Sequence, residues 1–171
     1  QQLLTFSTKL LIFFLFQVFS IGRAEAAPKK IAYIVSDISI PFWAVMSNGV
    51  QEAGVKNGYE VVVFSSENDL KKELVSVAQV IKNKFDGLII SPVNSRSCVT
   101  ILKLAKRAGI PVIISDIGTE SGEYTSFVSS DNKSGGYQIG KELAGQIRDQ
   151  GIDGTVGIIS IPQKRINGQM R

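Results

Sequence analysis

The sequence predicts an α/β protein built on an open, doubly wound sheet of parallel strands. Short apolar runs alternate along most of the chain with stretches whose apolar residues recur at helical spacing. The runs are continuously apolar, which is typical of strands buried on both faces of a parallel sheet. Because strand–helix–strand units cross over with right-handed connections, helices are expected on both faces of that sheet.

Six segments are predicted as strands. Each is short, follows a turn signal or the end of a helix, and is rich in apolar or β-branched residues. The segments cover residues 31–35, 61–64, 88–90, 111–114, 126–129 and 156–159. The first five each end in polar residues, so small polar groups are expected to gather at the carboxyl edge of the sheet, where such folds bind ligands.

Four helices are predicted between these strands, from apolar residues three or four positions apart. The first ends at Asn57-Gly58 and the third at Gly109, because Asn and Gly commonly terminate helices. Asp131 caps the fourth helix, which is predicted over 132–149.

Composition and charge exclude several classes of protein. The 171 residues are 44% hydrophobic and 20% charged, a globular balance that excludes a disordered, collagen-like or coiled-coil chain. The net charge of +4 is scattered, so no nucleic-acid partner is expected. The absence of His excludes Ser-His-Asp and Cys-His nucleophilic sites and most zinc sites. Cys98, the single Cys, cannot form an intrachain disulfide and is predicted as an inert core thiol.

No cofactor or metal is expected. Residues 36–41, which follow the first strand, contain no Gly, so this loop is not a phosphate cradle, and the sequence has no Walker pattern. Gly135, Gly136 and Gly140 lie within the fourth helix, where their spacing favours close packing over phosphate binding. A dinucleotide is therefore not expected, despite the fold class.

Residues 1–26 are predicted to be a cleaved secretory signal peptide. Lys9 precedes an apolar run over 10–19, and Ala24-Glu25-Ala26 supplies a small-x-small cleavage pattern. The alternative is a membrane anchor, but the run is about half of the roughly 20 apolar residues that a span needs. An exported protein of the periplasm follows, without a lipid anchor because no Cys follows the run.

Two aromatic residues open the first helix beside the end of the first strand. Phe42 lies on the apolar stripe of this helix, and Trp43 lies off it, about 100° further round. An aromatic ring at a ligand edge can stack on the apolar face of a sugar ring. Both residues are candidates for ligand binding, and packing in the core is the alternative for each.

Carboxylates follow two of the strands. Asp116 ends the fourth strand and is predicted to accept charge-assisted hydrogen bonds from ligand hydroxyl groups. Asp37 follows the first strand and has the same chemistry. The alternative for Asp116 is a helix or turn cap, which is weakened because no helix follows it at once. A further alternative is that the polar residues at all the strand ends are ordinary solvated loops.

The chain from Ile31 to about Arg171 resembles the ribose-binding-protein-like family of type I periplasmic binding proteins. The segments that carry the resemblance are IAYIVSDISIPFWAVMSNGVQEAGVKNGYEVVV, DGLIISPVNS, AGIPVIISD and FVSSDNKSGGYQIGKELA. The resemblance implies two similar α/β lobes joined by three crossovers, with ligand bound in the cleft between them. It places the first crossover, a hinge, at Ser130-Asp131.

The same resemblance divides the chain into residues 27–130 as the N-terminal lobe and 131–171 as the start of an incomplete C-terminal lobe. The chain is accordingly expected to be a fragment of a longer protein. Because each lobe of the family supplies part of the ligand's hydrogen bonding, these 171 residues alone are expected not to bind ligand tightly.

Site residues carry over one by one. Phe42 and Trp43 match the family's stacking aromatics, Asp116 its acceptor for ring hydroxyls, and Ser91 a polar group after the third strand. Arg171 resembles a family Arg whose role here stays open.

Two positions depart from the ribose binders. They have Asn where this chain has Ile40, and Arg where it has Ile117. Both changes remove polar contacts, which suggests a sugar other than ribose or a less hydroxylated ligand.

The function that the resemblance implies is capture of a sugar-like ligand in the interlobe cleft for an ABC importer. The alternative is a periplasmic sensing subunit for a membrane histidine kinase or chemoreceptor. No enzyme is expected, because the candidate residues include no paired general acid and base and no nucleophile with a base. The expected partners are a small polar ligand and a membrane permease or kinase, and the protein is expected to be a monomer.

Overall fold

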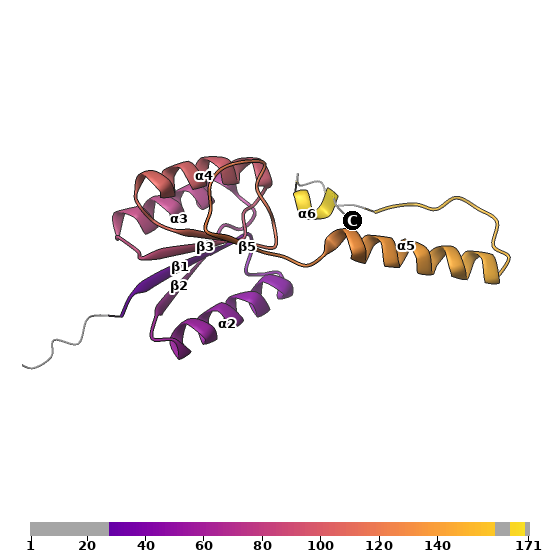
Figure 1. The fold of residues 1–171 in the computed structure, drawn as a ribbon, viewed down its shortest axis with the longest axis horizontal. Coiled ribbons are helices and arrows are strands. Elements are labelled where there is room, and N and C mark those ends of the chain that lie inside the picture. Colours follow the sequence, from indigo (N-terminus) through magenta and orange to yellow (C-terminus); the bar gives the residue numbers. More distant parts are fainter. Residues whose placement is uncertain (1–27, 160–164, 170–171) are drawn as a thin grey trace, which may run out of the picture.

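The fold is a five-stranded, wholly parallel sheet with helices on both faces (Figure 1). The computed structural model describes residues 28–159 and 165–169, so the predicted signal peptide and Arg171 lie outside the described residues. The strands are β1 Lys30–Val35, β2 Glu60–Ser65, β3 Gly87–Ile90, β4 Val112–Ser115 and β5 Ser126–Val128. Their order is β2-β1-β3-β4-β5, which confirms the predicted doubly wound fold class.

The register brings the carboxyl ends of the strands to one edge. Val35 at the end of β1 pairs with Ser65 at the end of β2, and Ile90 at the end of β3 pairs with Ile114. Since all pairs are parallel, the loops that follow β1 to β4 leave the sheet side by side. The polar strand ends singled out from the sequence therefore do gather along this edge.

The described residues form five helices, α2 Pro41–Lys56, α3 Leu70–Lys82, α4 Ser95–Arg107, α5 Asn132–Asp149 and the short α6 Ile166–Gln169. Helices α3 and α4 cover one face of the sheet and α2 lies on the other (Figure 1). Side chains cap three of the helices at their first turn: Asp69 on α3, Asn94 on α4 and Asp131 on α5. The four predicted helices and their ends at Asn57 and Gly109 are confirmed.

Two cores separate because successive strand residues point to opposite faces. Ala32 and Ile34 of β1 point into the larger core beneath α3 and α4, which also contains the buried Cys98. Tyr33 and Val35 point into the smaller core beneath α2. Cys98 is fully buried, which confirms the predicted core position of this thiol, and burial raises its pKa to about 12.

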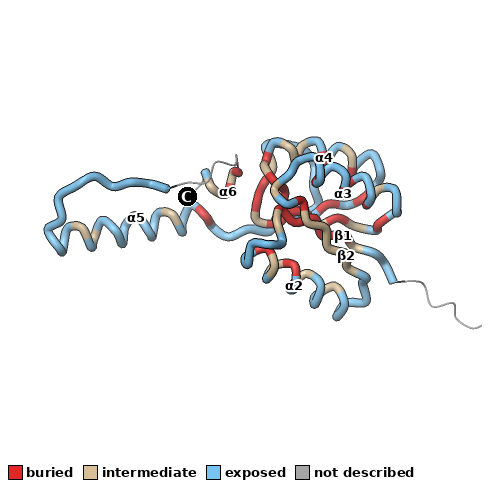
Figure 2. Tube along the Cα trace, turned by 180° about the vertical axis from the view of Figure 1, so that it is seen from behind, coloured by how far each residue is buried: buried red, intermediate tan, exposed pale blue. Residues whose placement is uncertain are grey.

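The region after β5 differs from the sheet. Helix α5 projects away from the body, and most of its length is exposed (Figure 2). The predicted strand at 156–159 is wrong: this segment is extended but unpaired, and Ile159 is fully exposed. A strand is held by hydrogen bonds to a neighbouring strand, and none of the described residues lies beside 156–159 to provide them.

Candidate functional site

A pocket of about 240 Å³ lies at the carboxyl edge of the sheet. Three parts of the chain meet around it: the start of α2, the end of β4 and residues 165–169, called here the α6 segment. Its lining residues are Ile40, Phe42, Trp43, Asp116, Arg165, Asn167 and Gly168. Three of the predicted site residues, two aromatic and one acidic, are thus brought together at one place.

The two aromatic rings of this pocket differ in their exposure to solvent. Phe42 is 53% exposed, whereas Trp43 is 4% exposed and packs in the smaller core against Tyr33, Val35 and Ile117. Their ring centroids lie 4.8 Å apart in an edge-to-face arrangement. Phe42 therefore offers the accessible aromatic surface and Trp43 supports it from below.

This corrects the predicted stripe of α2, which placed Phe42 inside and Trp43 outside. The helix turns small residues toward the sheet: Ser47 is buried and bonds back to the Trp43 carbonyl oxygen. A Cβ on Gly54 would lie 2.1 Å from Cγ2 of Val61, so the helix approaches β2 closely at this glycine. On this inner face, Met46 and Val50 pack against the smaller core, while the equally apolar Val45 is left exposed. The close approach at Gly54 therefore helps to set which apolar residues of α2 face the sheet.

Asp116 is set by an unusual backbone conformation at the end of β4. Its φ of 58° lies in the left-handed region, which residues with a Cβ rarely adopt and Asp tolerates better than most. Its N–H donates to the Val128 carbonyl oxygen at 2.8 Å, so β5 fixes the turn. Its Oδ2 accepts from the Asn167 side-chain amide at 2.7 Å, which orients the carboxylate in the pocket wall.

Asp37 and Ser91 lie behind this pocket and do not line it. Asp37 accepts from the Ser39 N–H and hydroxyl and from the Asn68 amide, at 3.0, 2.7 and 2.8 Å. The two bonds from Ser39 hold the pKa of Asp37 below its ordinary value. The Ser91 hydroxyl is fully buried 2.9 Å from that of Tyr33. Both residues support the loops that frame the site.

The predicted hinge lies next to the pocket. Ser130 and Asp131 join β5 to α5, and Asp131 caps α5 by accepting from the Ser134 N–H at 3.0 Å. A second hollow of about 300 Å³ runs between this connection and α6, lined among others by Phe127 and Asn167. The connection between β5 and α5 therefore lies next to α6.

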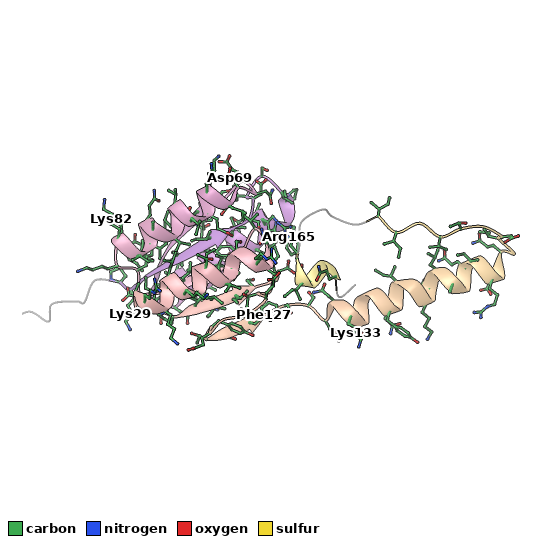
Figure 3. All side chains as sticks on the ribbon, turned by 90° about the horizontal axis from the view of Figure 1, so that it is seen from above. Lys29, Asp69, Lys82, Phe127, Lys133 and Arg165 are labelled. Carbon is green, nitrogen blue, oxygen red and sulfur yellow. The ribbon has the colours of Figure 1, made fainter. Side chains whose placement is uncertain are left out.

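The α6 segment contributes two residues that the sequence does not predict. Arg165, labelled in Figure 3, is only 9% exposed. Its Nε donates to the Val93 carbonyl oxygen at 3.0 Å and its Nη2 to Asn68 Oδ1 at 3.1 Å. Asn167 is likewise buried. No local pattern singles out either residue, because each acts through a contact with a segment far away in the sequence.

Glu73 of α3 is a second residue that the sequence did not reveal. It is fully buried, and its carboxylate accepts from the Val93 N–H at 2.6 Å and the Ser97 hydroxyl at 3.1 Å. Burial raises the pKa of Glu73 to about 7, against the opposite effects of these bonds and of the Arg165 charge. Burial also lowers the pKa of Arg165.

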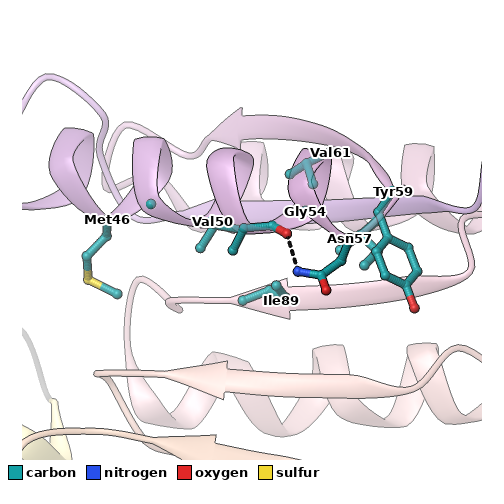
Figure 4. A pocket seen from close by; sticks show the side chains of 10 residues that line it. Met46, Val50, Gly54, Asn57, Tyr59, Val61 and Ile89 are labelled. Atoms are coloured by element: carbon teal, nitrogen blue, oxygen red, sulfur yellow. Dashed lines mark hydrogen bonds between the residues drawn. The ribbon is translucent and has the colours of Figure 1, made fainter.

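A larger apolar hollow, of about 470 Å³, lies beneath α2 and away from the strand ends (Figure 4). Met46, Val50 and Ile89 lie along it, and the Asn57 amide turns back to the Ala53 carbonyl oxygen at 2.7 Å. It holds no convergent set of polar groups. It is the part of the sheet face that α2 alone leaves open, and we do not place the site there.

The carboxyl-edge pocket combines three kinds of group: the Phe42 ring, the Asp116 carboxylate and the Asn167 amide. An aromatic face, a carboxylate and an amide can stack on a ring and pair with its hydroxyl groups. In the described ranges, no cluster of three or more acidic or thiol side chains is placed to hold a metal ion. Within the same ranges, no helix has the length and apolar character to cross a membrane.

Known proteins share the sequence pattern and the fold of this chain. The sequence profile described as periplasmic binding protein domain matches residues 31–170. The ribose import binding protein of Escherichia coli (strain K12) is 35% identical over 143 residues, which cover 80% of this chain and 48% of that protein. The chain therefore spans about half the length of the curated relatives it matches.

Two solved structures of ABC transporter solute binding proteins are similar. The protein of Bacillus halodurans C-125 with bound myo-inositol has a TM-score of 0.74 and 25% identity, covering 86% of this chain and 50% of that one. The protein of Actinobacillus succinogenes 130z with bound D-allose has a TM-score of 0.73 and 26% identity, covering 84% and 52%. Both are described as solute binding proteins, and each holds its solute in the solved structure.

Proposed function

Because this chain belongs to the periplasmic binding protein domain family, we propose that it captures a sugar-like ligand for an ABC importer. One observation carries the proposal: the exposed ring of Phe42 faces the same pocket as the carboxylate of Asp116 and the amide of Asn167. The relatives support it, since they include a ribose import binding protein and solute binding proteins with bound D-allose and myo-inositol.

Each residue has a distinct role in this proposal. Phe42 stacks on the apolar face of the sugar ring, with Trp43 as its rigid support. Asp116 accepts from ring hydroxyls with Oδ1, while Oδ2 stays bonded to Asn167. Ile40 lines the pocket with apolar surface, which favours a ligand that presents a less polar edge there than ribose does.

The domain division and the export step belong to the same proposal. Residues 27–130 form the first lobe, 131–171 begin the second, and Ser130-Asp131 is the hinge about which the lobes close on ligand. Residues 1–26 direct export and are then removed, which releases the protein into the periplasm, the compartment that the family's description names. A closed, ligand-loaded monomer would then be the form that the permease recognises.

A second candidate is supported by one relative. The fructose binding periplasmic domain of a hybrid two component system is 27% identical, with a TM-score of 0.63, and it covers 70% of this chain. Under this alternative the same pocket binds a sugar, but the closed form signals to a membrane histidine kinase. Binding to a purified permease, rather than to a kinase periplasmic segment, separates the two functions.

The test of sugar capture is a thermal-shift screen of the mature protein followed by calorimetric titration. The panel contains D-ribose, D-allose, D-glucose, D-arabinose and myo-inositol. A sugar present at 100 times its Kd is expected to stabilise the fold by about 2.7 kcal/mol. If no sugar or polyol shifts the melting temperature, while amino acids or other solutes do, capture of a sugar-like ligand is wrong.

A further inference from the structure

Hydrogen bonds fasten the α6 segment to the stretch of chain that joins β3 to α4. This stretch, residues 93–97, runs from the loop after β3 into the first turn of α4 and is called here the anchor loop. Its Val93 carbonyl oxygen accepts from Arg165 Nε at 3.0 Å, and its Ser95 hydroxyl oxygen accepts from the Ile166 N–H at 3.0 Å. Asn167, two residues after Arg165, donates its side-chain amide to Asp116 Oδ2.

The anchor loop is itself held from beneath by Glu73. One carboxylate oxygen accepts from the Val93 N–H and the other from the Ser97 hydroxyl. Glu73 is therefore hydrogen-bonded to the first and the last residue of the anchor loop. Val93 thereby receives Glu73 on its amide side and Arg165 on its carbonyl side. Hydrogen bonds thus link α3 to the anchor loop and the anchor loop to Arg165. The backbone joins Arg165 to Asn167, and a further hydrogen bond links Asn167 to Asp116.

A buried carboxylate is expensive to keep unless it is bonded and paired with opposite charge. Glu73 is fully buried and uses both oxygens on the anchor loop. The charged and titratable groups that face it are Arg165, ahead of α6, and Cys98, on α4. Neither Glu73 nor the Val93 amide lines the pocket. The buried carboxylate therefore acts on the anchor loop and not through direct contact with ligand.

We propose that Glu73 is a positioning residue for the pocket, which fixes the anchor loop so that Arg165 and Asn167 are held in place and Asn167 orients Asp116. The effect on ligand affinity rests on the proposed function, whereas the effect on the α6 segment does not. Loss of the Glu73 carboxylate is expected to free the α6 segment locally while the sheet and its larger core remain folded.

Limited proteolysis tests this positioning directly. Trypsin must take the Arg165 side chain into its own specificity pocket, so cleavage after Arg165 requires the bonds to Val93 and Asn68 to open. The mature protein at its natural length is digested well below its Tm, and the cut after Arg165 is followed by mass spectrometry. Affinity for D-ribose, D-allose and myo-inositol is measured in parallel.

Three variants separate positioning from general stability. Glu73→Ala is expected to speed the cut after Arg165 at least tenfold and to weaken binding of the probe sugar at least tenfold. Glu73→Gln keeps an oxygen for the Val93 N–H, so both quantities are expected to stay within threefold of wild type. Val80→Ala, a fully buried apolar site on the same helix, is expected to lower the Tm and leave the cut unchanged.

Contrary outcomes are equally defined. A cut after Arg165 that Glu73→Ala leaves within twofold of wild type, or that Val80→Ala speeds equally, overturns the positioning role. If Glu73→Ala does not fold, Ser97→Ala removes one bond to the carboxylate and must speed the cut at least threefold, or the proposal is wrong. If no panel member binds wild-type protein, the proposed function fails, while the cut still decides the role of Glu73.

Discussion

The sheet body and the arm that follows it, residues 132–169, are held by different kinds of contact. In the body, apolar side chains such as Ile34, Ile101 and Ile114 are fully buried between the sheet and α3 and α4. In the described part of the arm, residues 132–159 and 165–169, Ile139 and Ile158 are exposed, and the α6 segment returns to the body through the hydrogen bonds of Arg165, Ile166 and Asn167. The body therefore supplies stability, and the arm supplies one wall of the pocket.

The largest expected effect contrasts these regions directly. Ile101→Ala opens a cavity in the larger core and is expected to lower the free energy of unfolding by about 4 kcal/mol. Ile139→Ala removes the same atoms from the exposed face of α5 and is expected to change it by less than about 0.5 kcal/mol. Urea denaturation of residues 27–171 measures both. Equal losses at the two positions would contradict the division into body and arm.

The aromatic pair provides a second contrast, within the pocket itself. Trp43→Ala is expected to cost about 3 kcal/mol of unfolding free energy because its ring belongs to the smaller core. Phe42→Ala is expected to leave stability within about 1 kcal/mol of wild type and to weaken sugar binding by about 1 kcal/mol through lost stacking. Denaturation and calorimetric titration of both variants check this, and a larger stability loss for Phe42→Ala would reverse the assignment.

The carboxylate beneath the anchor loop makes the stability of the protein depend on pH. Because the folded pKa of Glu73 is about 7 and its ordinary value is 4.5, the folded protein keeps a proton between these pH values that the unfolded chain has lost. Stability from this group is fully present below about pH 4.5 and falls as pH rises to about 7, by up to about 3 kcal/mol.

Glu73→Gln removes this dependence, and Glu52→Gln, on the exposed side of α2, serves as the matched control. Urea denaturation between pH 5 and pH 8 is expected to give a flatter profile for Glu73→Gln than for either the wild type or the control. Profiles of equal slope in all three proteins would show that the titration belongs to another group.

The last expected effect concerns ligand binding alone. Asp116→Ala is expected to weaken binding of the probe sugar by about 2 kcal/mol, near thirtyfold, through lost charge-assisted hydrogen bonds. Asp37→Ala, whose carboxylate is already bonded to Ser39 and Asn68, is expected to weaken binding less than Asp116→Ala does. The reverse order in calorimetric titration would move the site toward the ends of β1 and β2.

Local pattern predicted the body well because each of its strands is both apolar and paired. A continuous apolar run is typical of a strand in a parallel sheet, and it marks β1 to β4. The extent of burial still differs: the carboxyl half of β1 is buried, whereas the edge strand β2 is partly exposed. The run at 156–159 is equally apolar, yet it forms no strand, since pairing requires a neighbouring strand that composition cannot reveal. The same limit explains the inner face of α2, which depends on how closely Gly54 meets Val61.

The pocket could be predicted only in part. Phe42, Trp43 and Asp116 follow from the rule that ligands bind at the carboxyl ends of strands, and the structure brings all three together. Asp37 and Ser91 obey the same rule but turn to protein partners, which only the packing decides. Arg165 and Glu73 lie 92 positions apart and meet through Val93, a long-range contact that no local pattern carries.

The most direct test of the central claim is a crystal structure of the protein with the panel sugar that gives the largest thermal shift. We expect the sugar ring to stack on Phe42, at least one ring hydroxyl to donate to Asp116 Oδ1, and the bond from Asn167 to Asp116 Oδ2 to persist. A sugar bound instead in the apolar hollow beneath α2, or held without contact to Phe42 and Asp116, would contradict the proposed site.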